Sequence, residues 1–401
     1  MKEVVICNPL RTANGSFGGA FKTVPAYDLA KVVMQRVIAD SGIDAGQLDE
    51  VIMGNIGQPS EAANIARVAA LYAGVPEHVP AYTVQRNCAS SIQAIVSAYQ
   101  SIQDDYGDLF MSGGMENMSQ IPYVIKGARW GLKLRHAELT DGLWEGLTDP
   151  TCNLIMGATA ENLAEQYAIT REEQDQYAVN SHKKAFMATR TGKFKDEIVP
   201  VEVVKRVAGQ EVAKETILQD ESINPGLSVQ KAALYPTVFK KNGTVTPANA
   251  CPMNDGAAAM LVTTADKAEK LGLQPMARIV SYGFAAVSPA YMGIGPAYAL
   301  PKTLARAGMK YDQLELVELN EAFAAQSLAV AKKMLADGNG WDWEKTNVNG
   351  GAIALGHPVG QSGARIVTTL LHEMKRRNLR YGAATLCVGG GQGAALILER
   401  V

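Results

Sequence analysis

The sequence lacks the features that would assign it to several large classes of protein. No apolar run approaches the roughly 20 residues of a membrane-spanning helix, and the Met-Lys-Glu-Val-Val-Ile-Cys start has no apolar core or cleavage site of a signal peptide. Lysine and arginine number 38 and aspartate and glutamate 40, and the resulting net charge of −2 gives no support for a nucleic-acid partner. We therefore expect a protein that binds neither membranes nor nucleic acids.

Cysteine and histidine are also sparse, with five of each in the chain. The cysteines are widely scattered and form no CxxC pair, which argues against a disulfide framework and predicts no bound metal. Reduced thiols are typical of a cytoplasmic protein, and we expect that location. Four of the histidines have polar surroundings that predict surface positions, namely His78, His136, His182 and His372.

A sequence pattern that recurs late in the chain indicates two similar halves. Two halves fit a chain of 401 residues, because one hydrophobic core seldom grows that large. Each half has a helical stretch, a glycine and then a segment that ends in a strand. Chance similarity between two amphipathic units is the alternative. Four residues of each half match at one constant offset, Gly42, Gln47, Leu48 and Val51 with Gly308, Gln313, Leu314 and Val317.

The alternation of strands and helices in both halves predicts a layered α/β architecture. Each half continues with a helix and then a strand that runs into glycines. The middle of the chain breaks this pattern, and we interpret it as an inserted loop domain that carries substrate contacts. The predicted parts are 1–116 and 251–274 for the N-terminal half, 117–250 for the insertion and 275–401 for the C-terminal half.

Two segments present side chains suited to nucleophilic catalysis. Cys88 follows a strand and precedes a helix, where unpaired amides and the helix dipole favour the thiolate and where its own amide can face an oxyanion. His357 stands between Gly356 and Pro358, in a turn that can present an imidazole to take a proton. Both residues also have a structural explanation, as a small buried residue beneath a helix and as a capping or core histidine.

Two further segments have residues suited to binding a reacting carbonyl or anion. Cys387 ends an apolar strand, and the glycines of 389–393 leave amide N–H groups free to bind an anion. A dinucleotide-binding loop is excluded because a strand rather than a helix follows. Asn320 can position a water or a carbonyl, and Glu321 is interpreted as a capping carboxylate for a helix that begins near Ala324.

Taken together, these segments resemble the signatures of the thiolase family, in the family's order. Asn-Glu-Ala-Phe at 320–323, Gly-His-Pro at 356–358 and Cys-x-Gly-Gly-Gly-x-Gly at 387–393 carry the resemblance, and further matches extend it over essentially the whole chain. It implies a thiolase-like fold of two similar halves, each a mixed five-stranded sheet with helices, plus the inserted loop domain. It also implies a homodimer or homotetramer that acts on acyl-CoA thioesters, with coenzyme A as substrate or product and no permanently bound cofactor.

The resemblance assigns a role to each segment. Cys88 would carry the acyl group, and His357 would activate it and help to form an oxyanion hole that a water held by Asn320 completes. Cys387 would remove or return the proton alpha to the second thioester carbonyl, and the amides of Cys88 and Gly389 would form a second oxyanion hole. Two thiols divide these tasks because an acylated residue cannot also take a proton.

The substrate channel is less well defined by the sequence. Substrate contacts would come from Met156, Cys251, Met292 and Phe323, and for the two methionines and the phenylalanine core packing is the alternative. The basic residues Lys126, Arg129, Lys133 and Arg135 can meet coenzyme A phosphates, with solvated surface charge as the alternative. Four positions depart from the usual family pattern, since Gln85 replaces Asn, Ser91 replaces Gly, Ile155 replaces His and Cys251 replaces Ser.

The resemblance implies an acetyl-CoA C-acetyltransferase of fatty-acid metabolism, which condenses two acetyl-CoA to acetoacetyl-CoA or cleaves that product. One alternative is a broad-chain 3-ketoacyl-CoA thiolase of fatty-acid degradation. A decarboxylating ketoacyl synthase is more distant, and the presence of Cys387 counts against it. The non-enzyme alternative is an inactive thiolase-like scaffold that binds acyl-CoA. The acyl-chain length and the physiological direction stay open.

Overall fold

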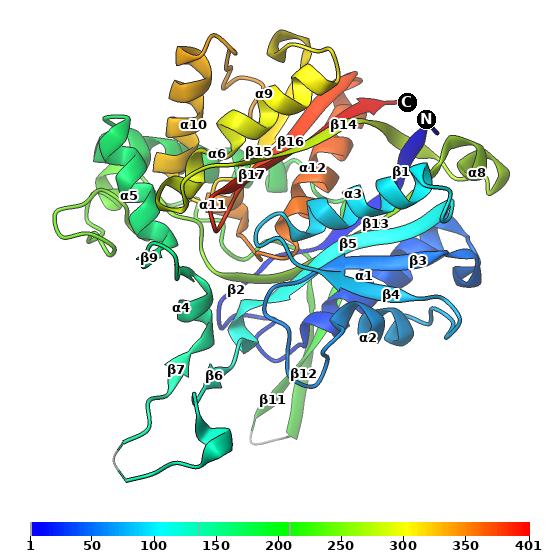
Figure 1. Ribbon diagram of the computed structural model, residues 1–401, viewed down its shortest axis with the longest axis horizontal. Helices are drawn as coiled ribbons and strands as arrows, with labels where there is room; N and C mark the ends of the chain where they lie inside the picture. The colour runs from blue at the N-terminus through cyan, green and yellow to red at the C-terminus, as the bar shows by residue number, and fades with distance from the viewer. Residues whose placement is uncertain (1, 135, 208–209) are drawn as a thin grey trace.

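The computed structural model describes residues 2–134, 136–207 and 210–401, and its largest feature is a mixed sheet of 11 strands (Figure 1). Nine strands follow one path in the order β15-β16-β17-β14-β1-β13-β5-β3-β4, with β10 beside β1 and β2 beside β13. The path strands are β1 Val4–Thr12, β3 Glu50–Gly54, β4 Ala81–Val84, β5 Leu109–Asn117, β13 Asn254–Thr264, β14 Pro275–Ala286, β15 Leu316–Leu319, β16 Tyr381–Val388 and β17 Gln392–Arg400.

The two halves contribute unequally to this sheet. The N-terminal half supplies the predicted five strands, β1, β13, β5, β3 and β4, in parallel and antiparallel pairs. The prediction of five strands is wrong for the described part of the C-terminal half, which supplies four. Where a fifth strand would lie, Thr346 forms only a single β-bridge with Val317. The chain turns away at the next residue, Asn347, which has a φ of 47°. The halves are also continuous, since β1 and β14 pair antiparallel with Ile6 opposite Ala277.

The helices form three layers around this sheet. The central layer consists of α3 and α12, which pack in one apolar cluster with strands of both halves. The helices α1 and α2 cover the other face of the N-terminal half, and α5, α9 and α10 cover that of the C-terminal half. Their bounds are α1 Ala26–Ser41, α2 Ile65–Tyr72, α3 Ser90–Gln103, α5 Met156–Gln166, α9 Pro296–Arg306, α10 Ala324–Ala336 and α12 Ser362–Arg377. The fold is the layered α/β arrangement that the sequence predicts.

The recurring sequence pattern corresponds to repeated local structure. Gly42 closes α1 with a φ of 70°, and Gly308 follows α9 with a φ of 66°, a left-handed conformation that favours glycine. One 3₁₀ turn then follows in each half, Ala45–Gln47 and Tyr311–Gln313, and leads into β3 and β15. The two halves are therefore similar in local structure as well as in amino-acid sequence.

The chain between β5 and β13 is an excursion from the N-terminal half, because these strands pair directly with Asp255 opposite Asn117. A capping box at Thr170 opens its longest helix. The assignment of domain limits at residues 116, 250 and 274 stays a prediction. The excursion contains α4 Gly142–Gly146, α5, α6 Arg171–Arg190, α7 Val229–Ala232, β6 Tyr123–Val124, β7 Thr140–Asp141, β8 Thr148–Asp149, β9 Leu154–Ile155, β10 Ile198–Val199, β11 Val201–Val207 and β12 Gln210–Ile217.

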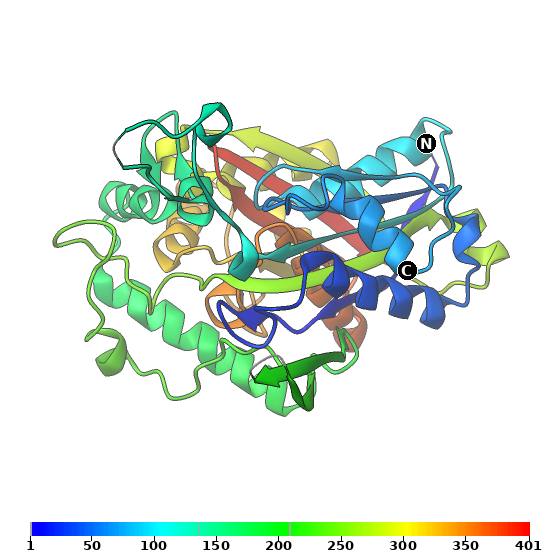
Figure 2. The same ribbon diagram turned by 90° about the horizontal axis from the view of Figure 1, so that it is seen from below.

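Part of this excursion, residues 121–134 and 136–141, projects below the body in Figure 1 as an arm that carries β6 and β7, and Figure 2 shows the same arm from below. Three of the basic residues considered above lie on it, exposed to solvent, and Arg135 lies outside the described residues. Large apolar side chains are exposed there too, with Trp130 at 85% and Leu134 at 98% of full exposure. The remaining elements of the molecule are β2 Gly15–Ser16, α8 Ala265–Lys270 and α11 Ala352–Leu355.

The predicted surface positions of the four histidines are only partly right. His78 and His136 are exposed. The prediction is wrong for His182, which the packing of α6 buries and whose Nδ1 accepts the Asn224 N–H at 3.1 Å. Burial lowers the pKa of His182 to about 4. His372 is half-buried in α12, with Nε2 3.0 Å from the Pro9 carbonyl.

Candidate active site

Cys88 lies in a tight turn between β4 and α3, as the sequence predicts. Asn87 has a φ of 42°, and the Ser90 N–H donates to the Asn87 carbonyl at 3.0 Å. The turn holds the thiol just ahead of α3, which begins at Ser90. The backbone N–H of Gly389, a residue about 300 positions later in the chain, acts on the Cys88 sulfur, and Asn87 Nδ2 donates to the Gly389 carbonyl at 2.8 Å. A contact thus joins the two predicted cysteine segments.

Burial governs the protonation of Cys88 more strongly than the local amides do. It raises the pKa of the thiol to about 11, whereas the N–H groups of Gly389 and Cys88 act in the predicted, lowering direction. The carboxylate of Glu116 adds a smaller upward shift. The resting residue is therefore a neutral thiol, and it needs a base to become a nucleophile.

His357 is fixed in the turn between α11 and α12. Its backbone N–H donates to Asn254 Oδ1 at 3.0 Å, and its Nδ1 lies 2.6 Å from Ser362 Oγ. The Ser362 hydroxyl gives its only proton to the Pro358 carbonyl at 2.7 Å, so it can only accept from the imidazole. Nδ1 therefore carries the imidazole proton, and Nε2 presents its lone pair.

The environment keeps this imidazole uncharged. Burial and the nearby Arg365 guanidinium lower the pKa of His357 to about 3. Asn320, at the end of β15, places its Nδ2 3.4 Å from the free Nε2. His357 and Asn320 therefore form a buried pair in which a neutral base faces an amide.

Glu321 does not have the predicted role, because α10 begins only at Ala324 after the extended residue Phe323. The intervening extended chain carries the carboxylate away from that helix. It instead accepts four hydrogen bonds, from Tyr177 Oη at 3.1 Å, Ser181 Oγ at 2.6 Å, Asn347 Nδ2 at 2.9 Å and the Ile353 N–H at 3.2 Å. It thereby ties α6 and the start of α11 to the segment of Asn320.

Cys387 ends β16 and is fully buried. Burial, together with Cys88 and Cys251, raises the pKa of its thiol well above the ordinary value. Gly390 and Gly391 follow with φ values of 84° and 78°, which reverse the chain into β17. This reversal returns Gly389 to the Cys88 turn. A side chain at position 389 would meet Asn87 Nδ2 and Met156 Sδ, each 3.4 Å from the place of its Cβ.

A cavity of about 540 Å³ opens beside Cys88, between its turn and the inserted segment. Gln85, Met156 and Gly389 contribute to its walls. The side chains of His357, Asn320 and Cys387 are not in the wall, although Val359 of the His357 turn is. Of the other predicted substrate contacts, Cys251, Met292 and Phe323 pack in the apolar cluster that contains Cys387.

Glu116, at the end of β5, is a wall residue that the sequence analysis missed. Its buried carboxylate joins three segments around Cys88, since it accepts N–H groups from the chain after β3 and from the His357 turn. Burial raises its pKa to about 7, although the donated N–H groups lower it. The only signal in the sequence is its position after two glycines in a strand. The donors are Asn55 Nδ2 at 3.1 Å, the Ile56 N–H at 3.1 Å, the Gly57 N–H at 2.9 Å and the Gly360 N–H at 2.9 Å.

Ser91, one of the departures from the usual family pattern, has a defined structural effect. Its Oγ accepts the N–H of Ala364 at 2.8 Å, in the first turn of α12. The N-cap of that helix, Gln361, makes no capping bond of its own. Ser91 therefore links the helix after Cys88 to the helix after His357. Ile155, by contrast, pairs with Thr148 and does not line the cavity.

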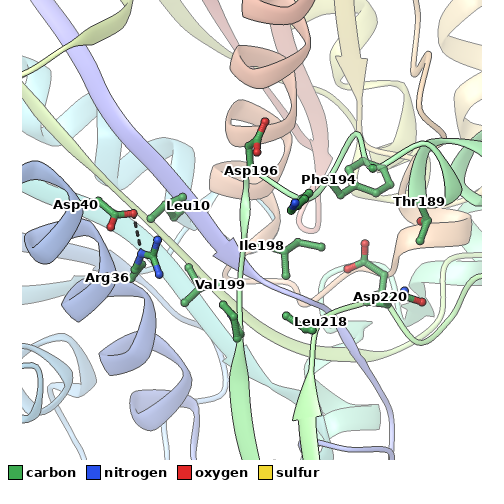
Figure 3. A pocket seen from close by; sticks show the side chains of 14 residues that line it. Leu10, Arg36, Asp40, Thr189, Phe194, Asp196, Ile198, Val199, Leu218 and Asp220 are labelled. Atoms are coloured by element: carbon green, nitrogen blue, oxygen red, sulfur yellow. Dashed lines mark hydrogen bonds and ion pairs between the residues drawn. The ribbon is translucent and has the colours of Figure 1, made fainter.

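A second cavity, of about 620 Å³, lies away from these residues, between α1 and the loops that flank β10 (Figure 3). Two of its charged wall residues already have partners, since Arg36 pairs with Asp40 at 2.7 Å and Asp220 with the buried Arg11 at 2.7 Å. We assign no chemistry to it.

Two features are absent from the described residues, namely a metal-binding cluster and a membrane-spanning helix. No group of three or more His, Cys, Asp or Glu side chains is arranged to hold a metal ion. In the same part of the chain, no helix combines the length and the apolar character needed to cross a membrane.

Comparison with known proteins identifies the family. The model of the thiolase N-terminal domain matches residues 4–266, and that of the thiolase C-terminal domain matches residues 273–400. The chain belongs to the thiolase family. It is 49% identical to an acetyl-CoA acetyltransferase of Pseudomonas aeruginosa, over all of both chains. This family membership makes the protein an acyltransferase.

Solved structures of thiolases share the whole fold. The acetyl-CoA acetyltransferase of Bacillus anthracis superimposes with a TM-score of 0.96 at 45% identity, over 100% of this chain and 99% of that one. Human mitochondrial 3-ketoacyl-CoA thiolase in complex with CoA gives a TM-score of 0.93 at 40% identity, over 100% of this chain and 98% of that one. The thiolase fold predicted from the sequence motifs is confirmed.

Proposed function

We propose that this thiolase is an acetyl-CoA C-acetyltransferase, which condenses two acetyl-CoA to acetoacetyl-CoA or cleaves acetoacetyl-CoA with coenzyme A. The shared cavity of Cys88 and Gly389 carries the proposal, because it brings a thiol and the glycine turn of a second thiol together, joined by the hydrogen bond from Asn87 to the Gly389 carbonyl. The relatives named acetyl-CoA acetyltransferase support the acetyl group as the unit transferred.

In the first half-reaction, Cys88 attacks the thioester carbonyl and coenzyme A leaves. His357 takes the thiol proton on Nε2, the atom that its hydrogen bond to Ser362 leaves unprotonated. Proton transfer creates an imidazolium and a thiolate in a buried site, where opposite charges attract strongly. Asn320, whose amide faces Nε2, holds the water that completes the oxyanion hole.

Cys387 gives its own proton to the departing coenzyme A thiolate and so becomes a thiolate itself. In the second half-reaction, this thiolate takes the proton alpha to the carbonyl of the incoming acetyl-CoA, and the resulting enolate attacks the acetyl group on Cys88. The N–H groups of Cys88 and Gly389, which line the same cavity, stabilise the oxyanion at the acetyl carbonyl on Cys88 both as the acyl-enzyme forms and as it breaks down. Carbon–carbon bond formation releases the Cys88 thiolate, which regains its proton. Coenzyme A is thus a substrate or product, and no bound cofactor takes part.

A broad-chain 3-ketoacyl-CoA thiolase of fatty-acid degradation is the second candidate, favoured by the likeness to the human mitochondrial enzyme. Met156 limits the acyl end of the cavity in either case, and Cys251, Met292 and Phe323 complete the channel when substrate is bound. Purified protein mixed with coenzyme A and 3-ketoacyl-CoA substrates of increasing length separates the two. We expect turnover of acetoacetyl-CoA to be fastest, and faster turnover of longer chains would favour the second candidate.

We also propose that the protein acts in the cytoplasm as a homodimer or homotetramer. The exposed apolar side chains of the arm, among them Trp130, Leu132 and Leu134, support a contact between copies. The strand β4 ends the main sheet path and offers an edge for pairing. Sedimentation of the intact protein tests this, and a monomer at micromolar concentration would contradict it.

A further inference from the structure

Asn87, the residue before the proposed nucleophile, makes a contact that none of the assigned roles uses. Its side-chain Nδ2 donates to the carbonyl of Gly389 at 2.8 Å. Cys88 lies beside the same glycine in the cavity wall, where the Gly389 N–H favours the thiolate form of Cys88. Two consecutive residues of one turn thus lie against a single residue in the other turn.

The glycine turn needs such an external restraint. Gly389, Gly390 and Gly391 have no side chains to fix their backbone, and glycine samples more conformations than any other residue. Asn87 is suited to supply the restraint, since asparagine tolerates the left-handed conformation that its φ of 42° requires. That conformation directs the carboxamide at Gly389 while the next residue presents its thiol.

A second contact between the same turns lies farther from the thiol. Arg86 Nη1 donates to Gln392 Oε1 at 3.1 Å, and the Arg86 guanidinium stacks on the ring of Phe284 at 4.1 Å. This contact fixes the turn where β17 begins. It does not reach the Gly389 carbonyl, which Asn87 holds. Substitution of Arg86 therefore tests the position of the turn, and substitution of Asn87 tests the orientation of Gly389.

We propose that Asn87 is a positioning residue that holds the backbone of Gly389 by its carbonyl, and thereby keeps the oxyanion-binding N–H of the preceding peptide group beside Cys88. The inference rests on the proposed function, in which that N–H stabilises the acyl-enzyme oxyanion. Without the Asn87 carboxamide, the Gly389 N–H points at the reacting oxygen for a smaller fraction of time. Formation and breakdown of the acyl-enzyme slow down, whereas binding of acyl-CoA is preserved.

Two variants isolate this hydrogen bond. Asn87→Gly removes the carboxamide but adopts the same left-handed backbone without strain, and Asn87→Asp keeps the shape but presents oxygen to the Gly389 carbonyl. Ser97→Ala, on the same helix as Ser90 but outside the cavity wall, serves as the matched control. Arg86→Met tests the outer contact.

The first measurement is the rate of acetyl-enzyme formation from acetyl-CoA in a rapid-quench experiment. We expect Asn87→Gly to be about 3- to 10-fold slower than the control, the loss that corresponds to one neutral hydrogen bond, with an unchanged concentration for half-saturation. Asn87→Asp should be slower still, and Arg86→Met should lie closer to the control. Acylation of both Asn87 variants at the rate of Ser97→Ala would overturn the proposal.

The second measurement is alkylation of Cys88 by iodoacetamide across pH, with the modified residue identified by mass spectrometry. Since the Gly389 N–H favours the thiolate, we expect both Asn87 variants to need a higher pH for the same rate. A lowered melting temperature with an unchanged alkylation profile would mean a purely structural role and would also overturn the proposal. If the unaltered protein forms no acetyl-enzyme, the proposed function fails, and the alkylation profile still decides the role of Asn87.

Discussion

The two halves of the molecule bring comparable elements to one cavity but give them different chemistry. In the N-terminal half, the turn before α3 carries Cys88 and the end of β5 carries Glu116. In the C-terminal half, the turn before α12 carries His357 and the end of β16 carries Cys387. The N-terminal pair reaches the cavity wall, whereas the C-terminal pair lies behind it. The repeated fold therefore supplies positions, and the local sequence supplies reactivity.

The two pairs also differ in how burial acts on them. Burial raises the pKa values of Cys88 and Glu116 to about 11 and about 7, and it lowers that of His357 to about 3. In each case it disfavours the charged form. The site at rest is thus largely uncharged, and charge separates only when a proton moves. Substitutions can test this difference between His357, a base that burial keeps neutral, and Glu116, an acid whose pKa lies near 7.

The largest effect is expected for Cys88→Ala, which removes the acyl-carrying thiol. Loss of a nucleophile should reduce kcat by at least about 10⁴-fold. Incubation with radiolabelled acetyl-CoA should leave no label on the protein. Label on the variant equal to that on the unaltered protein would exclude Cys88 as the acyl carrier.

Cys387→Ala should separate the two half-reactions. Because Cys88 and its oxyanion contacts remain, the variant should still be labelled by acetyl-CoA. Condensation and thiolysis should fall by about 10²- to 10⁴-fold, the range for loss of a general acid or base. If this variant is labelled no better than Cys88→Ala, the division of roles between the thiols is wrong.

His357→Asn should affect Cys88 most at neutral pH, where the thiol depends on a base. We expect the rate of acetyl-enzyme formation at pH 7 to fall by about 10²- to 10⁴-fold. Since burial raises the pKa of Cys88 to about 11, the difference should narrow as the pH approaches that value and the thiolate forms unaided. A constant ratio of the two rates from pH 7 to 10 would contradict this role.

Glu116→Gln should weaken the junction of three segments and change the response to pH. The raised pKa of about 7 means that the folded protein holds a proton that the unfolded chain releases near pH 4.5. Stability from this group is therefore present below pH 4.5 and is lost as the pH rises through 7, a change on the order of 3 kcal/mol. Chemical denaturation between pH 5 and 8 should show a smaller decline for Glu116→Gln. An identical decline in both proteins would contradict the assignment.

Ser91→Gly should have the smallest effect. It removes the acceptor for the Ala364 N–H at the start of α12, and loss of a cap of this kind costs about 0.5–2 kcal/mol. The melting temperature should therefore fall by a few degrees. A melting temperature equal to that of the unaltered protein would show that this link between α3 and α12 is not stabilising.

The sequence by itself determined much of this protein. The order of its motifs identified the family, and the helix followed by a glycine-ended strand in each half predicted the layered α/β fold. These features depend on residues close together in the chain. The segment before Cys-Ala-Ser indicates the turn that carries Cys88, and the glycines between two strands indicate the turn after Cys387. The sequence also placed Cys88 ahead of a helix and named His357, Asn320 and Cys387 as the chemical groups.

Only the tertiary structure decided how those groups behave. The hydrogen bond of Ser362 to Pro358 fixes the tautomer of His357, and Glu116 reaches the His357 turn from about 240 residues earlier in the chain. Glu321 binds α6 and α11 instead of capping α10, since extended chain separates it from that helix. At Cys88, burial raises the pKa of the thiol by more than the neighbouring N–H groups lower it. These outcomes depend on which segments meet across the sheet and on how much water they exclude, and neither quantity is local in sequence.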